Sequence, residues 1–285
     1  MNQDTAFKEA IAGTTDGQLG DLFHLHDVIL HHGDPRAEYL AVRDDRAVAL
    51  LDGMHLVSVH GRDAADYLNR RLSQRIKGMK PGEVRRAALL DATGKTLADM
   101  QVLADPNMPR HFYGEPFKLL SPVREGYSLA EDLERFVFSE DCKVLAPESA
   151  VQWAFVGPRR ADCLGALAAE MLDPFGDCMV LRPTGEDALA EFDALLPVLG
   201  ARLAGRVALE ARRIELGLPL YPVDFDENNT PLDAGLVSAI DRDKGCFPGQ
   251  ETIAKILNLG HPAKALVRVE LDGDGALLRD GWSSG

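Results

Sequence analysis

The sequence predicts an α+β fold, in which antiparallel sheets pack against helices. Segments typical of paired strands alternate with single helical segments, and the chain lacks the strict strand–helix–strand repeat that indicates a parallel sheet. A chain of 285 residues with 46% hydrophobic residues can bury a sizeable core, and its length suggests about two domains.

The first regular elements are expected from residue 47 onward. Residues 47–61 are rich in Val and Leu and contain an Asp52-Gly53 turn signal, which predicts a pair of strands. A helix starting near Asp63 as its N-cap is predicted next, from apolar residues at helical spacing, namely Ala64, Tyr67, Leu68, Leu72 and Ile76.

A second strand pair is predicted at residues 84–90 and 96–104, joined by a tight turn over residues 91–95. Prolines then predict that residues 105–123 are irregular or form a sheet edge, because proline cannot donate a backbone hydrogen bond. These prolines are Pro106, Pro109, Pro116 and Pro122.

The remainder of the chain predicts short strands and helices in alternation. Ser128 is the expected cap of a helix over 129–138, with Glu131 completing a capping box. The other predicted elements are strands at 142–145, 151–156 and 266–271, helices at 161–172, 187–199, 206–216 and 251–257, and a segment at 234–240 within a loop-rich region.

Composition excludes several classes of protein. The net charge of −14 argues against broad binding of duplex DNA, which needs a basic surface. No apolar run is long enough for a membrane span, and the first residues lack the pattern of a secretory signal. The four cysteines, Cys142, Cys163, Cys178 and Cys246, form no C-x-x-C pair, which disfavours a zinc ribbon. Because the chain shows no secretory signal, we expect these thiols to be free and the protein to be cytoplasmic.

One stretch has the opposite charge. Residues 69–86 hold seven cationic side chains against Glu83 alone, a net charge of +6. A solvated helix face followed by a loop is one interpretation, and a docking surface for an anionic ligand tail or a protein partner is the other. The seven are Arg70, Arg71, Arg75, Lys77, Lys80, Arg85 and Arg86.

A histidine cluster lies near the N-terminus, where Asp27 and Asp34 accompany His24, His26, His31 and His32. Imidazole and carboxylate groups can ligate a metal, but this spacing matches no defined site. We therefore predict no metal site here and interpret these histidines as exposed or capping residues.

The segment 243–251 combines two glycines and a proline with a thiol next to a lysine, and it leads into a predicted helix. A thiol near a cation and a helix N-terminus ionises more easily. The alternative is a turn in which Cys246 merely packs. The residues Lys-Gly-Cys-Phe-Pro-Gly-Gln-Glu resemble the motif K-G-C-aromatic-x-G-Q-E of the YgfZ-type folate-binding proteins, relatives of the glycine-cleavage T-protein (aminomethyltransferase).

Three further segments resemble this superfamily. Residues 213–221 resemble its R-I/L-E-x-G-x-x-x-Y segment, residues 230–236 its T-P-x-D/E-A-G-L segment, and residues 90–99 its hairpin with a pocket aspartate. The resemblance covers roughly residues 38–271.

The resemblance implies a ring-like pair of α+β domains around a central folate pocket, followed by a small β-barrel. It assigns residues 1–260 to the folate-binding region, with two intertwined subdomains, the second spanning roughly 46–145. Residues 261–285 would be a curtailed remnant of the barrel, since about one strand is expected after Pro262. The implied cofactor is tetrahydrofolate or a one-carbon derivative.

The resemblance also implies roles for individual residues. Asp99 corresponds to the acidic residue that faces the folate, where a carboxylate can bind or steer protonation of an amine. Arg213 is expected near the pterin and Tyr221 is expected to stack or donate a hydrogen bond, while ion pairing and core packing are their structural alternatives. The motif adds Lys244 and Cys246 to Asp99 as catalytic candidates, and Gly245 and Gln250 as folate-binding candidates.

Two positions depart from the T-protein pattern. The glutamate expected to grip the pterin falls on Ala190, so Glu191 takes the role only if the pattern shifts by one residue. The first acidic position of the hairpin is Ala98, which leaves Asp99 alone.

These features give three hypotheses of function. The first is a tetrahydrofolate-binding accessory protein of the YgfZ type that supports iron–sulfur cluster assembly or repair and dependent processes such as tRNA modification, with iron–sulfur client or assembly proteins as partners. The second is a folate-dependent aminomethyl or one-carbon transferase. The third is a scaffold that has lost folate.

Overall fold

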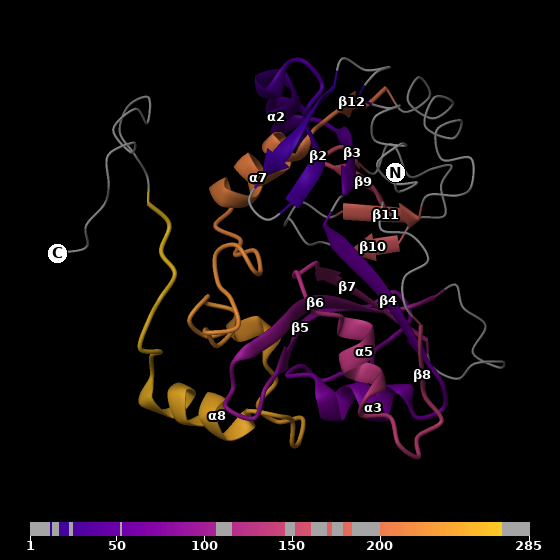
Figure 1. The fold of residues 1–285 in the computed structure, drawn as a ribbon, viewed down its shortest axis with the longest axis vertical. Helices are drawn as coiled ribbons and strands as arrows, with labels where there is room; N and C mark the ends of the chain where they lie inside the picture. The colour runs from indigo at the N-terminus through magenta and orange to yellow at the C-terminus, as the bar shows by residue number, and fades with distance from the viewer. Residues whose placement is uncertain are drawn as a thin grey trace.

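The computed structural model describes residues 12, 17–22, 25–51, 53–106, 116–145, 152–160, 170–172, 179–183 and 200–269. Two five-stranded sheets organise this part of the chain, one in each half of the view in Figure 1. A hairpin of β1 (Gln18–Leu22) and β2 (Leu25–His31) forms a third, two-stranded sheet.

The first sheet has the strand order β10-β11-β9-β3-β12. Its strands pair antiparallel except β12, which runs parallel to β3. Two helices, α2 (Pro35–Asp44) and α7 (Arg206–Glu215), share a buried apolar cluster with this sheet and lie together at its side in Figure 1. The strands are β3 (Ala47–Leu51), β9 (Gln152–Val156), β10 (Glu170–Leu172), β11 (Met179–Pro183) and β12 (Arg202–Leu203).

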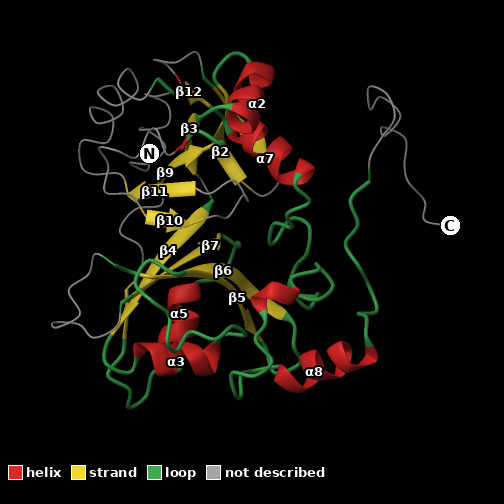
Figure 2. Cartoon of the chain, turned by 180° about the vertical axis from the view of Figure 1, so that it is seen from behind, coloured by secondary structure: helices red, strands yellow, loops and turns green. Residues whose placement is uncertain are grey.

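The second sheet is entirely antiparallel, with the strand order β5-β6-β7-β4-β8. The helices α3 (Ala64–Arg71) and α5 (Leu129–Glu134) cover one of its faces, as Figures 1 and 2 both show, and bury the largest apolar cluster against it. The strands are β4 (Met54–His60), β5 (Val84–Leu90), β6 (Thr96–Ala104), β7 (Phe117–Pro122) and β8 (Lys143–Leu145).

The two strands predicted within residues 47–61 exist, but the prediction that they pair is wrong. Strand β3 lies between β9 and β12 in the first sheet, and β4 lies between β7 and β8 in the second. Each strand therefore has neighbours on both of its edges, and the short connection between them carries the chain from one sheet to the other.

The prediction that residues 105–123 are irregular or edge-like is wrong for β7, which is the central strand of the second sheet. Its prolines lie at the boundaries of the strand: Pro116 precedes it and Pro122 ends it. The interior residues keep their amide groups, so β7 can pair with both β4 and β6.

The helix predicted from Asp63 is shorter than its apolar pattern. Helix α3 ends at Arg71, and Leu72 instead forms a bridge to Leu89 while the amide of Ser73 donates to the carbonyl of Ala88. The apolar residues of the pattern are buried in one cluster all the same, because the chain after α3 folds along the edge of β5. The Asp63 side chain accepts from the amide of Asp141 and does not cap the helix.

Other predicted elements are confirmed: β5, β6, β8 and α7 lie where the sequence places them, β9 begins at Gln152, and α5 is shorter than predicted. Ser128 caps α5 by accepting from the amide of Glu131. Helix α8 (Gln250–Leu259) is longer than predicted, and only Val237–Ala239 is helical in the segment at 234–240. The sequence patterns missed β1, β2, α2, β11 and β12.

Two predictions are wrong for the part of their residues that the structure describes. Residues 170–172, at the end of the helix predicted at 161–172, form the strand β10 instead. Residues 266–269, at the start of the strand predicted at 266–271, belong to no strand. The predicted helix at 187–199 and the barrel segment beyond residue 269 lie outside the described residues.

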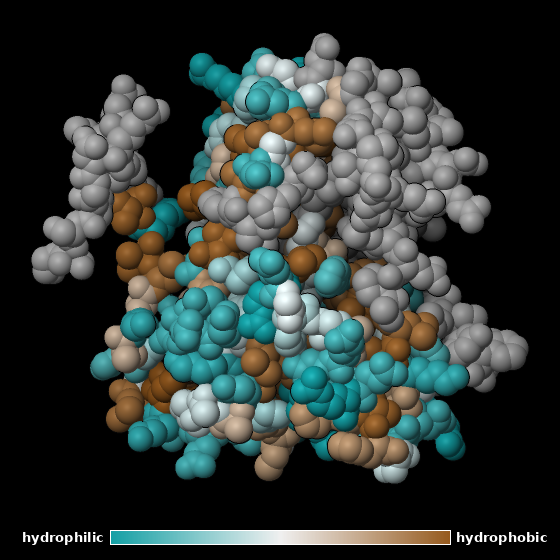
Figure 3. Space-filling model, viewed as in Figure 1, coloured by the Kyte–Doolittle hydropathy of each residue, from teal (hydrophilic) through white to brown (hydrophobic). Residues whose placement is uncertain are grey.

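The surface over the second sheet is largely hydrophilic on the face seen in Figure 3, and hydrophobic side chains are exposed along the extended segment after α8, where Leu266, Val267 and Val269 are among them. Among the helices that the structure describes, none combines the length and the apolar character needed to pass through a lipid bilayer.

Candidate functional site

Two loops far apart in the sequence meet at the β5–β6 hairpin. Gly249, in the loop before α8, lies so close to the turn at residues 91–95 that an added Cβ would stand 2.6 Å from the Cα of Gly94 and 2.7 Å from the carbonyl oxygen of Asp91. This contact joins the Lys244–Glu251 motif to the hairpin that carries Asp99, and it explains why both turns contain glycine.

Asp99 is a buried carboxylate on β6. Its two oxygens accept from Nε and Nη2 of Arg86 at 3.0 and 2.6 Å, and the same Nη2 donates to the carbonyl of Pro219 at 3.0 Å. Asp99 pairs with Ala88 across the hairpin and Arg86 with Gln101, so the ion pair is a diagonal one on a single face of the sheet.

A cavity of about 20 Å³ lies beside this ion pair. Its polar lining combines the Asp99 carboxylate, the Arg86 guanidinium and the Gln101 carboxamide, and Met54 and Leu120 supply apolar walls. The Pro219–Leu220 segment closes another side. This volume holds about one water molecule.

Tyr221 is buried behind the same hairpin. Its hydroxyl donates to the carbonyl of Leu97 at 3.1 Å and accepts from Nη1 of Arg124 at 3.0 Å, and its ring meets that of Phe225 edge-on. Burial raises the pKa of Tyr221 to about 12. In this arrangement Tyr221 fixes the 219–225 segment onto β6, and its ring is engaged in packing.

Arg213 is 2% exposed and lies in an ion-pair network at the end of α7. Its Nε donates to Glu210 at 2.7 Å, and its Nη1 donates to Asp224 at 2.5 Å and to the carbonyl of Leu218 at 2.6 Å. These bonds hold residues 218–224 against α7. Since Pro219 and Leu220 form one wall of the Asp99 cavity, Arg213 positions that wall without lining the cavity itself.

A second and larger cavity, of about 500 Å³, lies between α3 and the loop before α8. We call it the thiol pocket, and it is lined by Asn69, Arg70, Lys244, Cys246, Phe247 and Pro248. Cys246 is exposed within it, whereas Lys244 is 8% exposed. The Lys244 ammonium donates to the backbone carbonyl of Asn69 and stands 5.0 Å from the centroid of the Phe247 ring.

Burial lowers the pKa of Lys244 to about 8, with Arg75 acting in the same direction and Asp241 and Cys246 acting against it. The Asn69 carbonyl that accepts this hydrogen bond belongs to the last turn of α3, where carbonyl groups lack the partners that a continuing helix would supply. Such a position suits a cation, because the C-terminal end of a helix is electronegative. Lys244 can therefore exchange a proton near neutral pH while it stays in place.

The structure does not bring all the predicted site residues together. Asp99 and Arg213 lie near the small cavity, Lys244 and Cys246 line the thiol pocket, and the linings of the two cavities share no residue. Gly245 is exposed and Gln250 is the first residue of α8. The pterin-binding candidate Glu191 lies outside the described residues.

Sequence patterns missed two residues that shape these sites. Arg86 belongs to the cationic stretch, and the register of the hairpin places it diagonally across from Asp99. Asn69 gave no signal, because its contact with Lys244 depends on the end of α3 and spans 175 residues of sequence.

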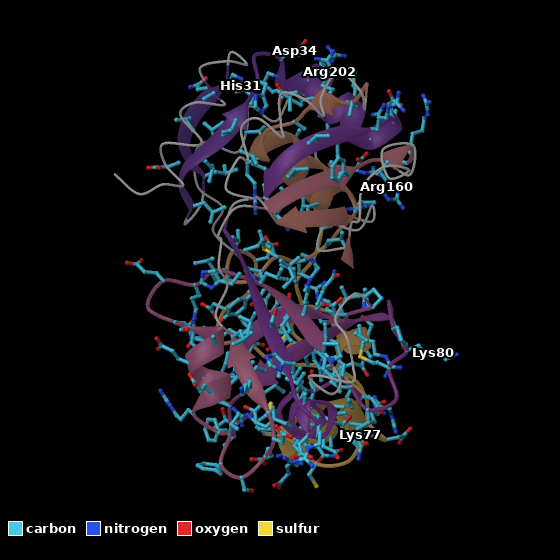
Figure 4. The ribbon with its side chains drawn as sticks, turned by 90° about the vertical axis from the view of Figure 1, so that its right-hand side faces the viewer. His31, Asp34, Lys77, Lys80, Arg160 and Arg202 are labelled. Carbon is cyan, nitrogen blue, oxygen red and sulfur yellow. The ribbon has the colours of Figure 1, made fainter. Side chains whose placement is uncertain are left out.

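The cationic stretch 69–86 is largely neutralised in the fold. Lys77 and Lys80 lie in the half of the molecule that contains the second sheet, whereas His31 and Arg202 lie in the other half (Figure 4). Glu83, which is already counted in the net charge, pairs with Arg85. Five acidic partners from outside the stretch offset most of the +6 charge: Asp66, Asp99, Asp132, Glu140 and Asp241.

We expect iodoacetamide to label Cys246 faster than the other three thiols at neutral pH. Cys246 is exposed, whereas Cys142 is buried, and burial raises the pKa of the Cys142 thiol to about 11. Peptide mapping by mass spectrometry over a time course measures the four rates. Equal labelling of all four cysteines would contradict a distinctive environment at Cys246.

The chain is similar to named proteins over most of its length. An aminomethyltransferase of Methylococcus capsulatus is 29% identical over 262 residues, which cover 82% of this chain and 69% of that protein. An aminomethyltransferase of Pseudomonas syringae pv. tomato is 27% identical over 264 residues, covering 79% of this chain and 70% of that protein. No protein-family model matches the chain.

The fold is also similar to a solved structure. The glycine cleavage system aminomethyltransferase T from Bartonella henselae superposes with a TM-score of 0.77, at 22% identity, over 88% of this chain and 74% of its own. The two chains share a fold, and together with the sequence relatives this supports the T-protein superfamily. Assignment to the narrower YgfZ-type subgroup is not supported by these similarities and has only the sequence motif around Cys246 in its favour.

Proposed function

We propose that this protein binds tetrahydrofolate and acts as a folate-dependent one-carbon transferase of the T-protein type. The observation that carries the proposal is Asp99, a buried carboxylate held by Arg86 at a polar cavity, in a chain whose relatives are named aminomethyltransferases. This is the second of the functions that the sequence suggests, and the similarities favour it over the iron–sulfur role.

The chemistry of the Asp99 cavity fits a pterin. Asp99 and the Pro219 carbonyl accept hydrogen bonds, Arg86 donates them, and the Gln101 carboxamide can do both. This set of groups complements the edge of a pterin ring, on which hydrogen-bond donors and acceptors alternate. The present volume of about 20 Å³ is far smaller than a drug-sized ligand site, so binding requires a wall to move.

In this proposal each residue has a defined task. Tetrahydrofolate supplies the amine that accepts the one-carbon unit. Asp99 accepts a hydrogen bond or a proton from that amine, and Arg86 fixes the direction of the carboxylate by its two-pronged contact. Arg213 and Tyr221 act as positioning residues, because they hold the Leu218–Phe225 segment that closes the cavity.

The Asp99→Asn variant tests the site. We expect the unaltered chain to bind a reduced folate with a Kd near micromolar, about −8 kcal/mol, and the variant to bind at least tenfold more weakly, a loss of about 1.4 kcal/mol. The cause is that asparagine lacks the negative charge that pairs with Arg86 and receives the proton. Isothermal titration calorimetry measures both constants.

Asp105→Asn is the matched control, because Asp105 is also buried and ion-paired, with Lys118, and it directly follows the end of β6. This control should bind folate like the unaltered chain. A folded protein that gives no saturable heat would refute folate binding, and equal affinity of the Asp99→Asn variant would refute the role of Asp99. Turnover of an aminomethyl donor then separates a transferase from a protein that only binds folate.

The thiol pocket favours a second candidate function, the YgfZ-type accessory role in iron–sulfur cluster maintenance and tRNA modification. Its support is the exposed Cys246 beside the buried Lys244, within a motif that resembles that subgroup. Deletion of the gene should then lower the activity of iron–sulfur enzymes, and the Cys246→Ala variant should not restore it. Full rescue by Cys246→Ala would contradict this role.

A further inference from the structure

We propose that the thiol pocket is a site of thiol–disulfide exchange, in which Cys246 reacts with small disulfides that carry carboxylate groups. This inference goes beyond one-carbon transfer and needs no folate. It rests on four features of the pocket: its volume, the exposure of the thiol, the held position of Lys244, and the cation contributed by Arg70.

The pocket has room for a small organic ligand beside the thiol. Its volume of about 500 Å³ lies within the usual range of small-molecule sites, about 300–1,000 Å³. Figure 1 shows that α3 and α8 lie at the same end of the molecule, and the pocket lies between α3 and the loop that leads into α8. Phe247 and Pro248 give it an apolar floor, and Cys246 is open to solvent.

Lys244 is held in a fixed position in the pocket that contains this thiol. The Lys244 ammonium donates a hydrogen bond to the Asn69 carbonyl, and the Asn69 side-chain amide donates to the Lys244 carbonyl at 3.5 Å. Among the surrounding charged groups, Arg75 lowers the pKa of Lys244, and Asp241 and Cys246 raise it against the larger effect of burial. The thiolate is the form that attacks disulfides, and Lys244 places a cationic side chain in the pocket where that thiolate reacts.

Arg70 supplies the contact for a carboxylate. Its side chain is 55% exposed, and Nη2 pairs with Glu140 at 2.7 Å. A guanidinium has five N–H donors in a fixed fork, so this pairing leaves donors that can turn toward a ligand. Glu140 offsets part of the charge, and Lys244 adds a second positive charge within the pocket, so the pocket favours an anionic disulfide over a cationic one.

The exchange step balances without any further reagent. The Cys246 thiolate attacks one sulfur of the disulfide RSSR, a bond forms between the two sulfurs, and the S–S bond of the reagent breaks. Cys246 is oxidised to a mixed disulfide, and the departing half of the reagent is reduced to a thiolate. The proton that Lys244 accepted from Cys246 returns to that thiolate, giving the free thiol RSH.

Intact-mass spectrometry of the full chain with oxidised glutathione tests the proposal. We expect one added glutathione per chain, at Cys246 by peptide mapping, and a rate at least tenfold above that of free N-acetylcysteine at pH 7.5. Lys244→Met should lower this rate at least tenfold. Lys255→Met, which removes an exposed lysine of α8 that does not line the pocket, should leave it unchanged.

A second comparison tests the class of disulfide. With each rate divided by that of N-acetylcysteine, we expect oxidised glutathione to react at least fivefold faster than cystamine, a cationic disulfide. Arg70→Gln should remove this preference, and because Arg70 is exposed the substitution should leave the fold intact.

Either of two results would overturn the inference: a Cys246 rate no higher than that of N-acetylcysteine, or equal normalised rates for the two disulfides in the unaltered chain. Both results are measured on the unaltered chain, so they do not require the Lys244→Met variant to fold, and neither measurement involves folate. Failure here is therefore distinguishable from failure of the one-carbon function, which the calorimetric titration tests separately.

Discussion

Replacing Glu210 with alanine is expected to lower the free energy of unfolding by about 3–5 kcal/mol, the cost of breaking a buried ion pair from one side. Glu210 lies on α7 between two arginines and is 4% exposed, and Arg206 and Arg213 are 4% and 2% exposed. Its Oε1 accepts from Nε of Arg206 at 2.9 Å, and its Oε2 accepts from Nε of Arg213 at 2.7 Å.

The cost is large because both arginines stay charged at any accessible pH. Without Glu210, Arg213 keeps Asp224 and the Leu218 carbonyl, but two buried cations lose the carboxylate that they share. Glu210→Gln preserves the shape and part of the hydrogen bonding, so its effect should lie between those of the unaltered chain and the alanine variant.

Urea unfolding monitored by circular dichroism measures the change. Glu215→Ala is the matched control on the same helix, because Glu215 pairs with Arg212 at an exposed position and its loss should cost about 1 kcal/mol at most. If the Glu210→Ala and Glu215→Ala variants had the same free energy of unfolding, the buried ion pairs of Glu210 would contribute no more to stability than the exposed pair of Glu215.

Gly249→Ala is expected to destabilise the protein by about 2–5 kcal/mol, the sum of left-handed backbone strain and of overpacking against a neighbouring loop. Gly249 has a φ of +76°, and its added methyl would overlap the backbone of Gly94 and Asp91, which cannot move aside like a flexible side chain. We also expect the loop before α8 to lift from the β5–β6 hairpin.

Gly245→Ala separates these two causes. Gly245 lies in the same loop with a φ of +97°, but an added methyl there meets nothing within 4 Å. Its substitution should therefore show the strain alone, about 1–2 kcal/mol. Equal losses for the two variants in chemical unfolding would show that the close approach to Gly94 contributes nothing.

Features encoded in adjacent residues could be predicted from the sequence, and pairings between distant segments could not. The β5–β6 hairpin follows from its own turn, in which the Asp91 side chain accepts from the amides of Thr93 and Lys95. Strand β3 pairs instead with β9, about a hundred residues later in the chain, and no local signal specifies that partner.

The same distinction applies to the candidate sites. The motif around Cys246 identifies a thiol and a lysine because only one residue separates them in the sequence, and the structure places both in one pocket. It gave no indication of Asn69, the group that holds Lys244, or that Arg213 is committed to Glu210 and Asp224. Those assignments depend on burial, which is a property of the assembled fold.

The placement of β3 and β4 in different sheets has a consequence for the order of folding. Every strand of the second sheet comes from residues between 54 and 145, so this sheet can form while the first still lacks β9 to β12. When β4 pairs with β8, at Ser58 and Leu145, it brings together the chain on either side of that segment. Pairing β3 with β9 on its own would close a loop of about a hundred residues at a large entropic cost. Once β4 has paired with β8, the ends of that loop are already close together, so only a short segment must be ordered for β3 to pair with β9. We therefore expect the second sheet to form first and to guide the register of the first.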